Sequence, residues 1–421
     1  GINHADAITT AILAEQAGAD AIHVSAYANP ASGAAFTEAP LVHQPAGYLD
    51  YAEGIKQKLS IPVIAVGRIE PGEGDAAIAS GKADFIAMGR KLLADPDLPA
   101  RLRQGRPEDI RPCIYCYTCV SRIFVNDHVR CAVNPATGFE HETVVSPAEE
   151  PRKVLVVGGG PAGMEAARIA AQRGHQVRLA EQDKRLGGTA FFASVVYPEN
   201  GRLVEYLQAQ IARSSVDLDL GVTVDAEYLD RFQPDAVIVA TGARREAPDI
   251  PGVDQDNVFS GDEMRALMTG DGAGSAKGKL AFWQRWVLTL AGYLGITRNA
   301  ALLTRLSHLW MPLGKQVCIV GGGLVGAELA EFLAQRGRKV SLIEESGKFA
   351  VELPLVRRWR VLEELKQLSI VMINHTRLLR VSGRQLLIEC QGNEVEIEAD
   401  TIILASGARG DLDLAERIRR M

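Results

Sequence analysis

The sequence has few cysteines, little net charge and no long apolar run, and each shortage excludes a class of protein. Four of its six cysteines lie between positions 113 and 131 of the 421 residues, so we expect a reducing cytoplasm rather than a disulfide framework. Cys318 and Cys390 lie in apolar strand patterns and are expected in the core. A net charge of −6 gives no reason to expect nucleic acid or an anionic membrane as partner. In the leucine- and tryptophan-rich segment 274–312, the longest uncharged run, 286–297, is far shorter than the ~20 residues of a transmembrane helix, and no secretory signal opens the chain.

The clustered cysteines are the most informative feature that is present. Cys113, Cys116 and Cys119 recur at a spacing of three in C-I-Y-C-Y-T-C, and Cys131 follows after eleven further residues. Four thiolates in this pattern suit the corners of a [4Fe–4S] cluster. A structural zinc ion is the first alternative, but zinc sites usually pair two C-x₂-C knuckles, and here the second knuckle is absent. Unliganded thiols are the remaining alternative.

The chain also contains an internal repeat. Residues 154–181 and 317–344 share an apolar strand, a glycine-rich turn, a helix and a second strand that ends in glutamate. Each copy later reaches a matching strand and turn, V-I-V-A-T-G-A-R at 237–244 and I-I-L-A-S-G-A-R at 402–409. Two copies of one α/β unit predict two nucleotide-binding domains.

Each copy carries the complete G-x-G-x-x-G fingerprint of a dinucleotide site in its required strand–turn–helix context. The first glycine permits the tight turn, the second lets the backbone approach a pyrophosphate, and the third lets the helix pack on the strand. The pyrophosphate is expected at the positive end of the helix dipole, and the terminal acid is expected to accept hydrogen bonds from the ribose hydroxyls. The residues concerned are Gly158, Gly160, Gly163 and Glu181 in the first copy and Gly321, Gly323, Gly326 and Glu344 in the second.

The acids of the second copy also predict which nicotinamide cofactor binds there. A site that selects a 2′-phosphate favours arginine near the end of the second strand, whereas Glu344 and Glu345 repel that phosphate. We therefore expect NADH rather than NADPH at the second site.

The first 110 residues predict short buried strands at 21–26, 62–68 and 84–90 with helices between them. A Gly-Arg pair ends two successive strands, which is typical of the last strands of a (β/α)₈ barrel, where the loops hold a phosphate through backbone N–H groups. Gly67, Arg68, Gly89 and Arg90 are therefore candidates for a clamp on the phosphate of FMN. The alternative is that the glycines only permit tight strand exits and the arginines face solvent.

Together these parts resemble the Old Yellow Enzyme-like iron–sulfur flavoproteins, of the 2,4-dienoyl-CoA reductase, trimethylamine dehydrogenase and NADH:flavin oxidoreductase type. The segments that carry the resemblance are P-V-I-A-V-G-R-I, A-D-F-I-A-M-G-R-K-L-L-A-D-P-D-L-P, R-P-E-D-I-R-P-C-I-Y-C, G-G-G-P-A-G-M-E-A-A and A-T-G-A. The resemblance implies FMN in the barrel, a [4Fe–4S] cluster on the cysteines, FAD at the first fingerprint and the pyridine nucleotide at the second. It also implies that further residues line the cofactor sites, namely Gly187, Gly188, Thr241, Gly242 and, in the second copy, Gly407.

The resemblance implies an α/β chain with five parts. These are the C-terminal strands and helices of a TIM barrel (1–110), an iron–sulfur segment and linker (111–150), a Rossmann-like FAD domain (151–270), a hydrophobic helical insertion (271–313) and a Rossmann-like NAD(P) domain (314–421). An eight-stranded barrel usually takes about 250 residues. We therefore expect the earlier barrel strands, with the proton-donating residues, and the family's terminal Gly-Asp segment to lie outside the sequence. No catalytic acid is named, and we expect no turnover from the 421 residues alone.

The function that the resemblance implies is a relay from NADH through FAD, the cluster and FMN to an activated C=C bond of a small molecule, of the 2,4-dienoyl-CoA or enoate type. Two alternatives stay open. The C-x₂-C-x₂-C run followed by V-S-R is more like trimethylamine dehydrogenase, which suggests an amine dehydrogenase or demethylase. A non-catalytic electron-transfer or cofactor-binding fragment is the other.

One segment, 274–312, is not explained by these parts. It is rich in leucine and tryptophan, with scattered arginines. The simpler interpretation is a helical hairpin that packs on the neighbouring domains. The alternative is an interfacial helix or a subunit contact in a homo-oligomer.

Overall fold

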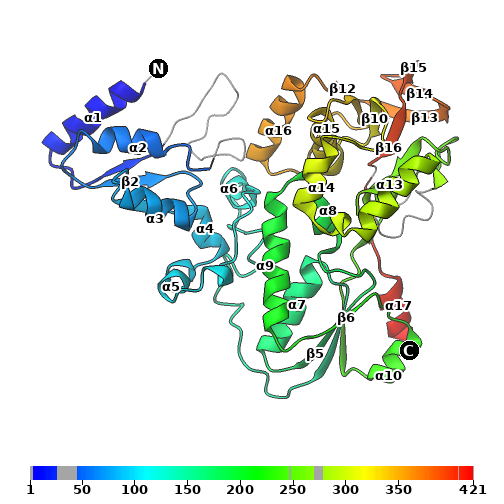
Figure 1. Cartoon of the computed structure of the whole chain (residues 1–421), viewed down its shortest axis with the longest axis horizontal. Helices are drawn as coiled ribbons and strands as arrows, with labels where there is room; N and C mark the ends of the chain where they lie inside the picture. The colour runs from blue at the N-terminus through cyan, green and yellow to red at the C-terminus, as the bar shows by residue number, and fades with distance from the viewer. Residues whose placement is uncertain (1–2, 26–44, 246–247, 270–277, 406, 421) are drawn as a thin grey trace. The chain divides into compact units, whose positions relative to one another are not determined.

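The computed structural model describes residues 3–25, 45–245, 248–269, 278–405 and 407–420 (Figure 1). The chain forms two compact units: residues 1–138 with 354–363, and residues 139–353 with 364–421. The end of the predicted strand at 21–26 and the first residues of the predicted insertion (271–277) lie outside the described residues. Each unit is described by itself.

The first unit contains the strand–helix alternation that the sequence predicts. Three short parallel strands pair in the order β1 (Ile22–Val24), β2 (Val63–Val66) and β3 (Phe85–Ala87). Helices α1 (His4–Gln16), α2 (Leu49–Lys56), α3 (Pro71–Ala79), α4 (Gly89–Ala94) and α5 (Leu98–Arg103) accompany them. Ala52 and Ile55 of α2 bury against Val63 and Ala65 of β2. The carboxyl ends of β2 and β3, where the Gly-Arg pairs follow, therefore lie at one edge of the sheet.

The first fingerprint copy builds a parallel sheet in the order β6-β5-β4-β7, from β4 (Lys153–Val157), β5 (Gln176–Glu181), β6 (Asp217–Leu220) and β7 (Ala236–Val239). Because successive side chains of a strand point to opposite faces, β4 contacts two helical layers. Val154 and Val156 pack under α7 (Pro161–Gln172) and α9 (Glu199–Arg213), which lie side by side in Figure 1. Leu155 and Val157 pack under α10 (Ala226–Phe232) and α17 (Asp413–Arg420).

The second copy repeats this plan in the order β12-β11-β10-β16-β9, and all five strands are parallel. The strands are β9 (Val258–Ser260), β10 (Gln316–Val320), β11 (Lys339–Ile343), β12 (Val371–Ile373) and β16 (Thr401–Leu404). Helix α15 (Leu324–Ala334) follows the fingerprint, and α16 (Leu355–Gln367) precedes β12. The internal repeat therefore predicts the two nucleotide-type sheets correctly.

The sequence patterns did not predict two smaller sheets. An antiparallel sheet of β13 (Thr376–Ser382), β14 (Gln385–Cys390) and β15 (Asn393–Glu398) connects β12 to β16 and shares a core with them. Cys318 is buried in that core as expected, while Cys390 is only partly buried. Strands β8 (Ala243–Arg244) and β17 (Arg409–Gly410) pair antiparallel and return the chain from the second copy to the first.

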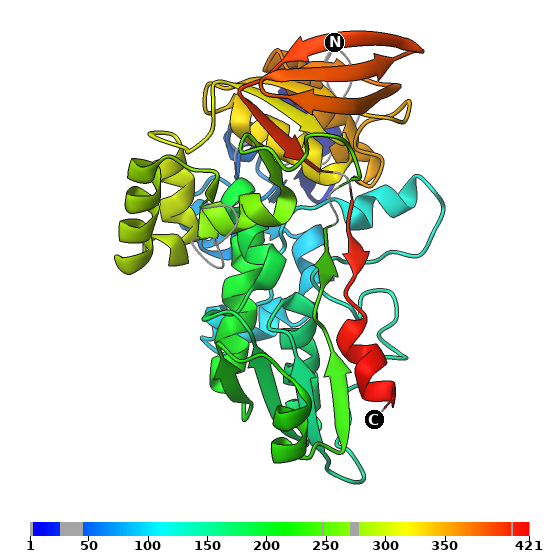
Figure 2. The ribbon, with the colours of Figure 1, turned by 90° about the vertical axis from the view of Figure 1, so that its right-hand side faces the viewer.

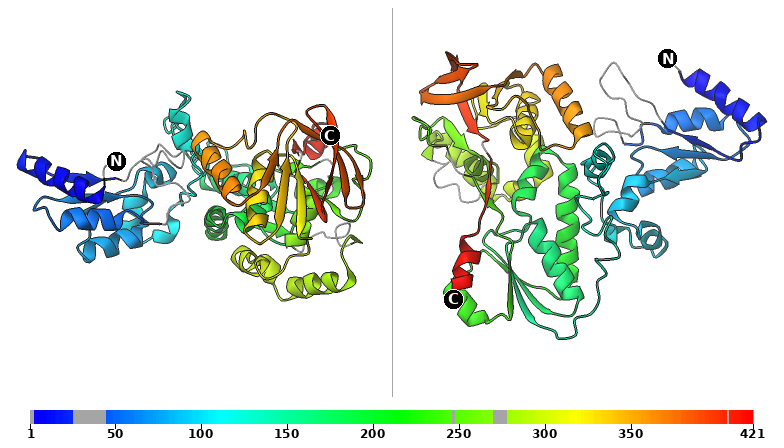
Figure 3. Two further views of the ribbon diagram at one scale, coloured as in Figure 1. Left: turned by 90° about the horizontal axis from the view of Figure 1, so that it is seen from above. Right: turned by 180° about the vertical axis from the view of Figure 1, so that it is seen from behind.

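The residues between the two copies form helices, as the sequence predicts. Helix α11 (Gly261–Thr269) is followed by α13 (Phe282–Tyr293), the short 3₁₀ helix η3 (Ile296–Arg298) and α14 (Ala300–Ser307). The α13–α14 hairpin projects from the side of the second unit in Figure 2. At the end of the chain, α17 lies beside α10 (Figures 1 and 3), and Leu414 of α17 packs against Tyr228 and Phe232 of α10.

Candidate cofactor-binding sites

The cysteine run is irregular as far as Tyr117 and continues into a short helix. Tyr115 and Tyr117 have positive φ angles of 53° and 66°, and α6 (Thr118–Ile123) then begins. The backbone N–H of Tyr115 donates to Sγ of Cys113 at 3.4 Å. Val356, in the same unit, packs against Tyr117 and Val120.

The four thiols influence one another electrostatically. Burial raises the pKa of Cys113 and of Cys131. Burial raises the pKa of Cys119 to about 11, and the neighbouring charges of Cys116, Cys113 and Cys131 add to the increase. The raised pKa values keep Cys113, Cys119 and Cys131 protonated unless a bound cation or cluster compensates the charge of their thiolates.

A site for a single metal ion is not formed by these thiols. Within the described residues, no three side chains of His, Cys, Asp and Glu are placed so that they could hold one ion. The assignment of Cys113, Cys116, Cys119 and Cys131 to a [4Fe–4S] cluster stays a prediction from their spacing.

The arginines of the predicted phosphate clamp lie beside the cysteine run rather than in open solvent. Arg68 is 8% exposed, and its guanidinium lies 4.3 Å from the centre of the Tyr115 ring. Arg90 lies over the rings of Tyr115 and Tyr117 at 5.4 and 4.9 Å. The two Gly-Arg pairs are thus brought together, as a clamp requires, and the solvent-facing alternative for Arg68 is wrong. Gly67 is required for a local reason, because a Cβ there would lie 2.6 Å from the Tyr48 ring.

A buried lysine completes this positive cluster, and the sequence patterns did not identify it. Lys91 Nζ lies 2.7 Å from Oε1 of Glu70 and donates to the Tyr115 hydroxyl, which in turn donates to the same carboxylate at 2.7 Å. The charges of Arg90 and Lys91 act to lower the pKa of Cys113, against the larger effect of burial. The tyrosines inside C-I-Y-C-Y-T-C are the signal in the sequence that identifies this contact.

The first fingerprint opens into a cavity of about 350 Å³. Its walls include most of the residues that the sequence assigns to FAD, namely Gly158, Gly160, Glu181, Gly188, Thr241 and Gly242. Gly163 lies behind the wall, where a Cβ would come within 1.8 Å of the Gly158 carbonyl oxygen. Gly187 donates its N–H to the Gly159 carbonyl at 2.8 Å, which holds the next loop against the fingerprint. The cavity and its glycine walls fit a nucleotide.

Residues from the end of the chain also line this cavity, and the sequence did not predict them there. Asp411, Asp413, Leu414 and Arg417 contribute to its walls. The Thr241 hydroxyl donates to the Asp411 carbonyl oxygen at 2.9 Å, and Arg244 lies 3.0 Å from the Asp411 carboxylate. The β8–β17 pairing thus carries a segment 170 residues away in sequence into the first site.

The terminal acids of the two copies have the same geometry. Glu181 accepts hydrogen bonds from the N–H groups of Gly159 at 2.5 Å and Asp183 at 2.8 Å. Glu344 accepts from Gly322 at 2.6 Å and Ser346 at 2.8 Å. In both copies the carboxylate therefore ties the glycine turn to the end of the second strand, a bracing role in addition to the expected role at the ribose.

The second fingerprint has the same backbone, and the loop after β11 contacts it as the loop after β5 contacts the first. Gly321 and Gly158 share φ angles of 107° and 109°. Ala350 N–H donates to the Gly322 carbonyl at 2.7 Å, and a Cβ on Gly322 would lie 2.4 Å from the Phe349 ring. Glu352 accepts a hydrogen bond from the Leu324 N–H at 3.0 Å. A carboxylate of the chain itself thus occupies the end of α15 where the pyrophosphate is predicted.

The other glycines of the second site lie as their counterparts in the first copy do. Gly323 precedes α15 as its N-cap, and a Cβ on Gly326 would lie 1.9 Å from the Gly321 carbonyl oxygen. Gly407 follows β16 with a φ of 81°, the same value as Gly242 after β7 in the first copy. Gly89 begins α4 in the first unit.

Comparison with known proteins identifies two families along the chain. Residues 152–419 match the pyridine nucleotide-disulphide oxidoreductases, and residues 2–109 match the NADH:flavin oxidoreductase / NADH oxidase family. Among the described residues, no helix combines the length and the apolar character that crossing a membrane requires.

Individual proteins are similar over nearly the whole chain. An NADH oxidase of Thermoanaerobacter brockii is 34% identical over 94% of this chain, and a cinnamate reductase of Clostridium sporogenes is 32% identical over 90%. The solved structure of a 2-naphthoyl-CoA reductase with 2-naphthoyl-CoA superimposes on 99% of the chain with a TM-score of 0.84 and 26% identity. The chain spans 56%, 52% and 58% of the lengths of these three proteins.

Proposed function

The chain belongs to the Old Yellow Enzyme-like iron–sulfur flavoprotein family, and on this premise we propose that the whole protein is an NADH-dependent oxidoreductase that reduces an activated C=C bond. The reductions that relatives are named for, of cinnamate and of 2-naphthoyl-CoA, support a conjugated acid or its CoA thioester as the substrate class. We expect a reducing cytoplasm as its compartment, because the cysteines must stay unpaired to bind a cluster.

The observation that carries the proposal is the presence of three different cofactor-type sites in one chain. The arginine and cysteine cluster of the first unit, the cavity of the first fingerprint and the second fingerprint, with Glu352 at its helix N-terminus, suit different ligands. When bound, FMN, FAD, the [4Fe–4S] cluster and NADH supply hydride and single-electron transfer, which links a two-electron donor to a C=C bond.

The residues of the chain bind and orient these groups. Cys113, Cys116, Cys119 and Cys131 hold the cluster, and Gly67, Arg68, Gly89 and Arg90 hold the phosphate of FMN. Positive charge on Arg90 and Lys91 favours an anionic centre at the cysteines.

In the second unit, the two fingerprints divide the nucleotides between them. Gly158, Gly160 and Gly188 approach the pyrophosphate of FAD through their backbones, and Glu181 fixes the turn. Gly321, Gly323 and Glu344 do the same for NADH.

The full-length protein, purified without oxygen, tests the proposal by its visible spectrum. Addition of NADH should bleach both flavin and cluster absorbance, and a cinnamate-type acid or its CoA thioester should restore them. Cys116→Ser should lower the iron content and the cluster absorbance, whereas Cys390→Ser, a cysteine outside the predicted ligand set, should change neither. Full cluster absorbance in Cys116→Ser would refute the ligand assignment.

The spacing of the cysteines supports a second candidate function, that of an amine dehydrogenase or demethylase of the trimethylamine dehydrogenase type. Its distinguishing result is bleaching by secondary or tertiary methylamines together with no response to NADH or NADPH. A protein that bleaches with NADH but reduces only artificial acceptors supports the third candidate, an electron-transfer module.

A further inference from the structure

Helix α13 exposes an apolar stripe that no other part of the unit covers among the described residues. Phe282, Trp286, Leu290 and Tyr293 recur at intervals of three and four, so they share one face of the helix. They are 75, 64, 57 and 89% exposed. The rings of Phe282 and Trp286 contact each other edge to face at 6.2 Å, which makes the stripe continuous. An exposed apolar patch of this kind marks an interaction surface.

The charged residues of the segment that carries this stripe have one sign. Residues 278–313 contain no Asp or Glu, and their basic residues are Lys279, Arg285, Arg298 and Arg305. Lys279 pairs with Glu263 at 2.9 Å, but the three arginines are exposed. A chain with a net charge of −6 thus presents a local surface that is positive and apolar. Such a surface is complementary to a partner that has negative charges at its surface and an apolar layer below them.

The hairpin is fixed to the unit by its second helix, which leaves the first helix free to face outward. The Thr304 hydroxyl donates to the Val195 carbonyl at 2.8 Å, and Arg336 Nε donates to the Ser307 hydroxyl at 2.6 Å. Trp283 of α13 and Trp310, after α14, contact each other at 5.6 Å. The stripe is therefore presented on an anchored support.

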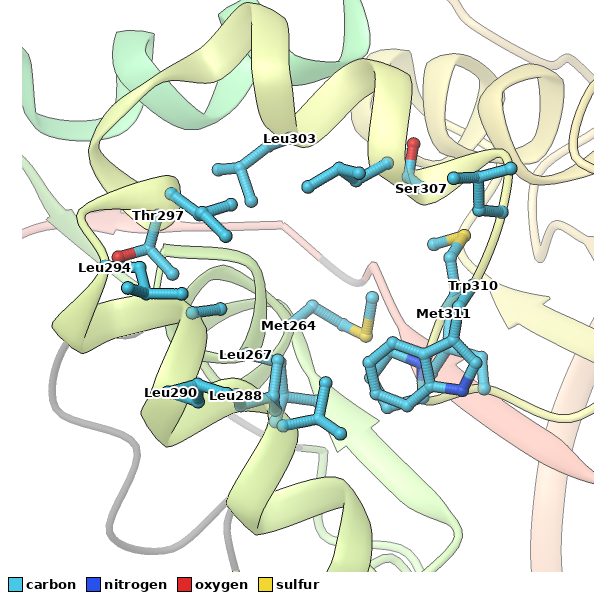
Figure 4. A pocket seen from close by; sticks show the side chains of 17 residues that line it. Met264, Leu267, Leu288, Leu290, Leu294, Thr297, Leu303, Ser307, Trp310 and Met311 are labelled. Carbon is cyan, nitrogen blue, oxygen red and sulfur yellow. The ribbon is translucent and has the colours of Figure 1, made fainter.

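Beneath α13 lies a cavity of about 340 Å³ with an almost wholly apolar wall. Figure 4 shows Leu290 and Leu294 on the α13 side, Leu303 of α14 opposite, and Met264 of α11 between them. Thr297 and Ser307 contribute hydroxyl groups to this wall (Figure 4). The size and apolar wall suit a flexible hydrocarbon chain.

We propose that residues 278–313 dock on an anionic lipid bilayer, with α13 lying in the interface and the cavity taking one acyl chain. Tryptophan and tyrosine prefer the boundary between headgroups and hydrocarbon, and arginine binds anionic headgroups. A helix of twelve residues is too short to span a bilayer but long enough to lie in its surface. The low net charge of the whole chain predicted no such partner, because it averages over this local excess of positive charge.

Flotation of the full-length, cofactor-loaded protein with lipid vesicles tests the proposal and requires no turnover. Vesicles of phosphatidylglycerol and phosphatidylcholine should carry the protein upward, and pure phosphatidylcholine should carry at least tenfold less. Raising the salt from 0.05 to 0.5 M, two concentrations chosen to screen the arginines, should also release it. Protein that stays at the bottom of the gradient with both vesicle types overturns the proposal.

Two variants locate the contact. Phe282→Ser/Trp286→Ser/Tyr293→Ser removes exposed side chains that do not line the cavity and should reduce flotation at least tenfold. Arg298→Glu/Arg305→Glu should abolish the preference for anionic vesicles. Val144→Ser/Val395→Ser is the matched control, since it removes exposed apolar side chains elsewhere, and it should float like the wild type.

Light scattering in solution separates a lipid surface from a second copy of the chain. Melting temperature and NADH oxidation should be unchanged in all three variants, which shows that they fold. Flotation of the triple variant at the wild-type level overturns the proposal. So does a wild-type dimer that the triple variant converts to a monomer without any vesicle binding, because the stripe is then a subunit contact.

Discussion

The two fingerprint copies have the same backbone conformation and differ in the residues that surround the glycine turn. Both have the tight turn, the bracing glutamate and the glycine against which the helix packs. The first copy opens into a cavity whose walls include a loop from 187–189 and residues from the end of the chain. The loop after the second strand contacts the glycine turn in both copies, and in the second copy a carboxylate of that loop, Glu352, also accepts a hydrogen bond at the helix N-terminus.

This difference indicates two ways of using one motif. A cavity walled from several distant segments suits a nucleotide that remains bound, because many contacts must break before it leaves. A helix N-terminus at which a carboxylate of the chain already accepts a hydrogen bond suits a nucleotide that enters and leaves in each cycle, since that nucleotide competes with the carboxylate. This difference supports the proposed assignment of FAD to the first copy and NADH to the second.

Substitution of the third glycine of a fingerprint should have the largest effect on cofactor binding, and the affected cofactor should differ between the two copies. Gly163→Ala and Gly326→Ala each force a Cβ to within 2 Å of a carbonyl oxygen, at 1.8 and 1.9 Å. Overpacking of this kind costs about 1–3 kcal/mol, which is roughly 5- to 150-fold in binding. Gly163→Ala should therefore lose FAD during purification while Gly326→Ala keeps it, as measured by flavin content per chain. Equal loss in both variants would contradict the assignment.

Neutralising the bracing acid should have the next largest effect. Glu344→Gln keeps an acceptor for the Gly322 N–H but removes the charge that repels a 2′-phosphate. We expect the preference for NADH over NADPH to fall about tenfold, which corresponds to about 1.4 kcal/mol, in steady-state kinetics. Glu181→Gln makes the same change in the first copy and should leave the preference unaltered. An unchanged preference in Glu344→Gln would contradict the statement that the charge of Glu344 repels the 2′-phosphate of NADPH.

Glu352 should have a smaller effect of the opposite sign. Its carboxylate occupies the N-terminus of α15, so a pyrophosphate has to displace it or bind beside a like charge. A charge in this position is worth about 0.3–1 kcal/mol, so Glu352→Gln should lower the KM for NADH about two- to fivefold at low salt. The exposed neighbour Glu345, changed to Gln, is the control for net charge. A higher KM in Glu352→Gln would show that the loop contact supports binding instead.

The surface contact that brings the chain end to the first site should have the smallest effect. Arg244 lies 3.0 Å from Asp411 and 2.7 Å from Asp413, but its side chain is 63% exposed. Exposed ion pairs contribute little to stability. Arg244→Gln should therefore leave the melting temperature and the flavin content unchanged. Loss of flavin in this variant would show that the pair, rather than the β8–β17 pairing, holds the segment in place.

The repeat explains why so much of the fold could be predicted. An apolar strand, a glycine turn and a helix are local in sequence, so β4–α7–β5 and β10–α15–β11 follow directly from their patterns. The antiparallel β13–β15 sheet was not predicted, because its strands lie outside the repeated unit, in the connection between β12 and β16. The arrival of Asp411 beside Thr241 depends on a pairing between strands 165 residues apart, Arg244 with Arg409, which no local pattern indicates.

The candidate sites show the same limit. Glycines and cysteines at fixed spacing mark their positions, but the partners of each side chain come from the fold. Arg68 and Arg90 were predicted as a phosphate clamp, and their stacking on Tyr115 became visible only when β2, β3 and the cysteine run were placed together. Glu352 was not predicted at all, because a carboxylate eight residues past the bracing Glu344 carries no recognisable motif.

Anaerobic titration of the Gly326→Ala protein with NADH tests most directly whether the first fingerprint binds FAD and the second binds NADH. The account predicts full flavin content and full bleaching by dithionite, but no bleaching at NADH concentrations that reduce the wild-type protein completely. Bleaching by NADH at the wild-type concentration would contradict it, because the nucleotide would then reach the flavin without the second fingerprint.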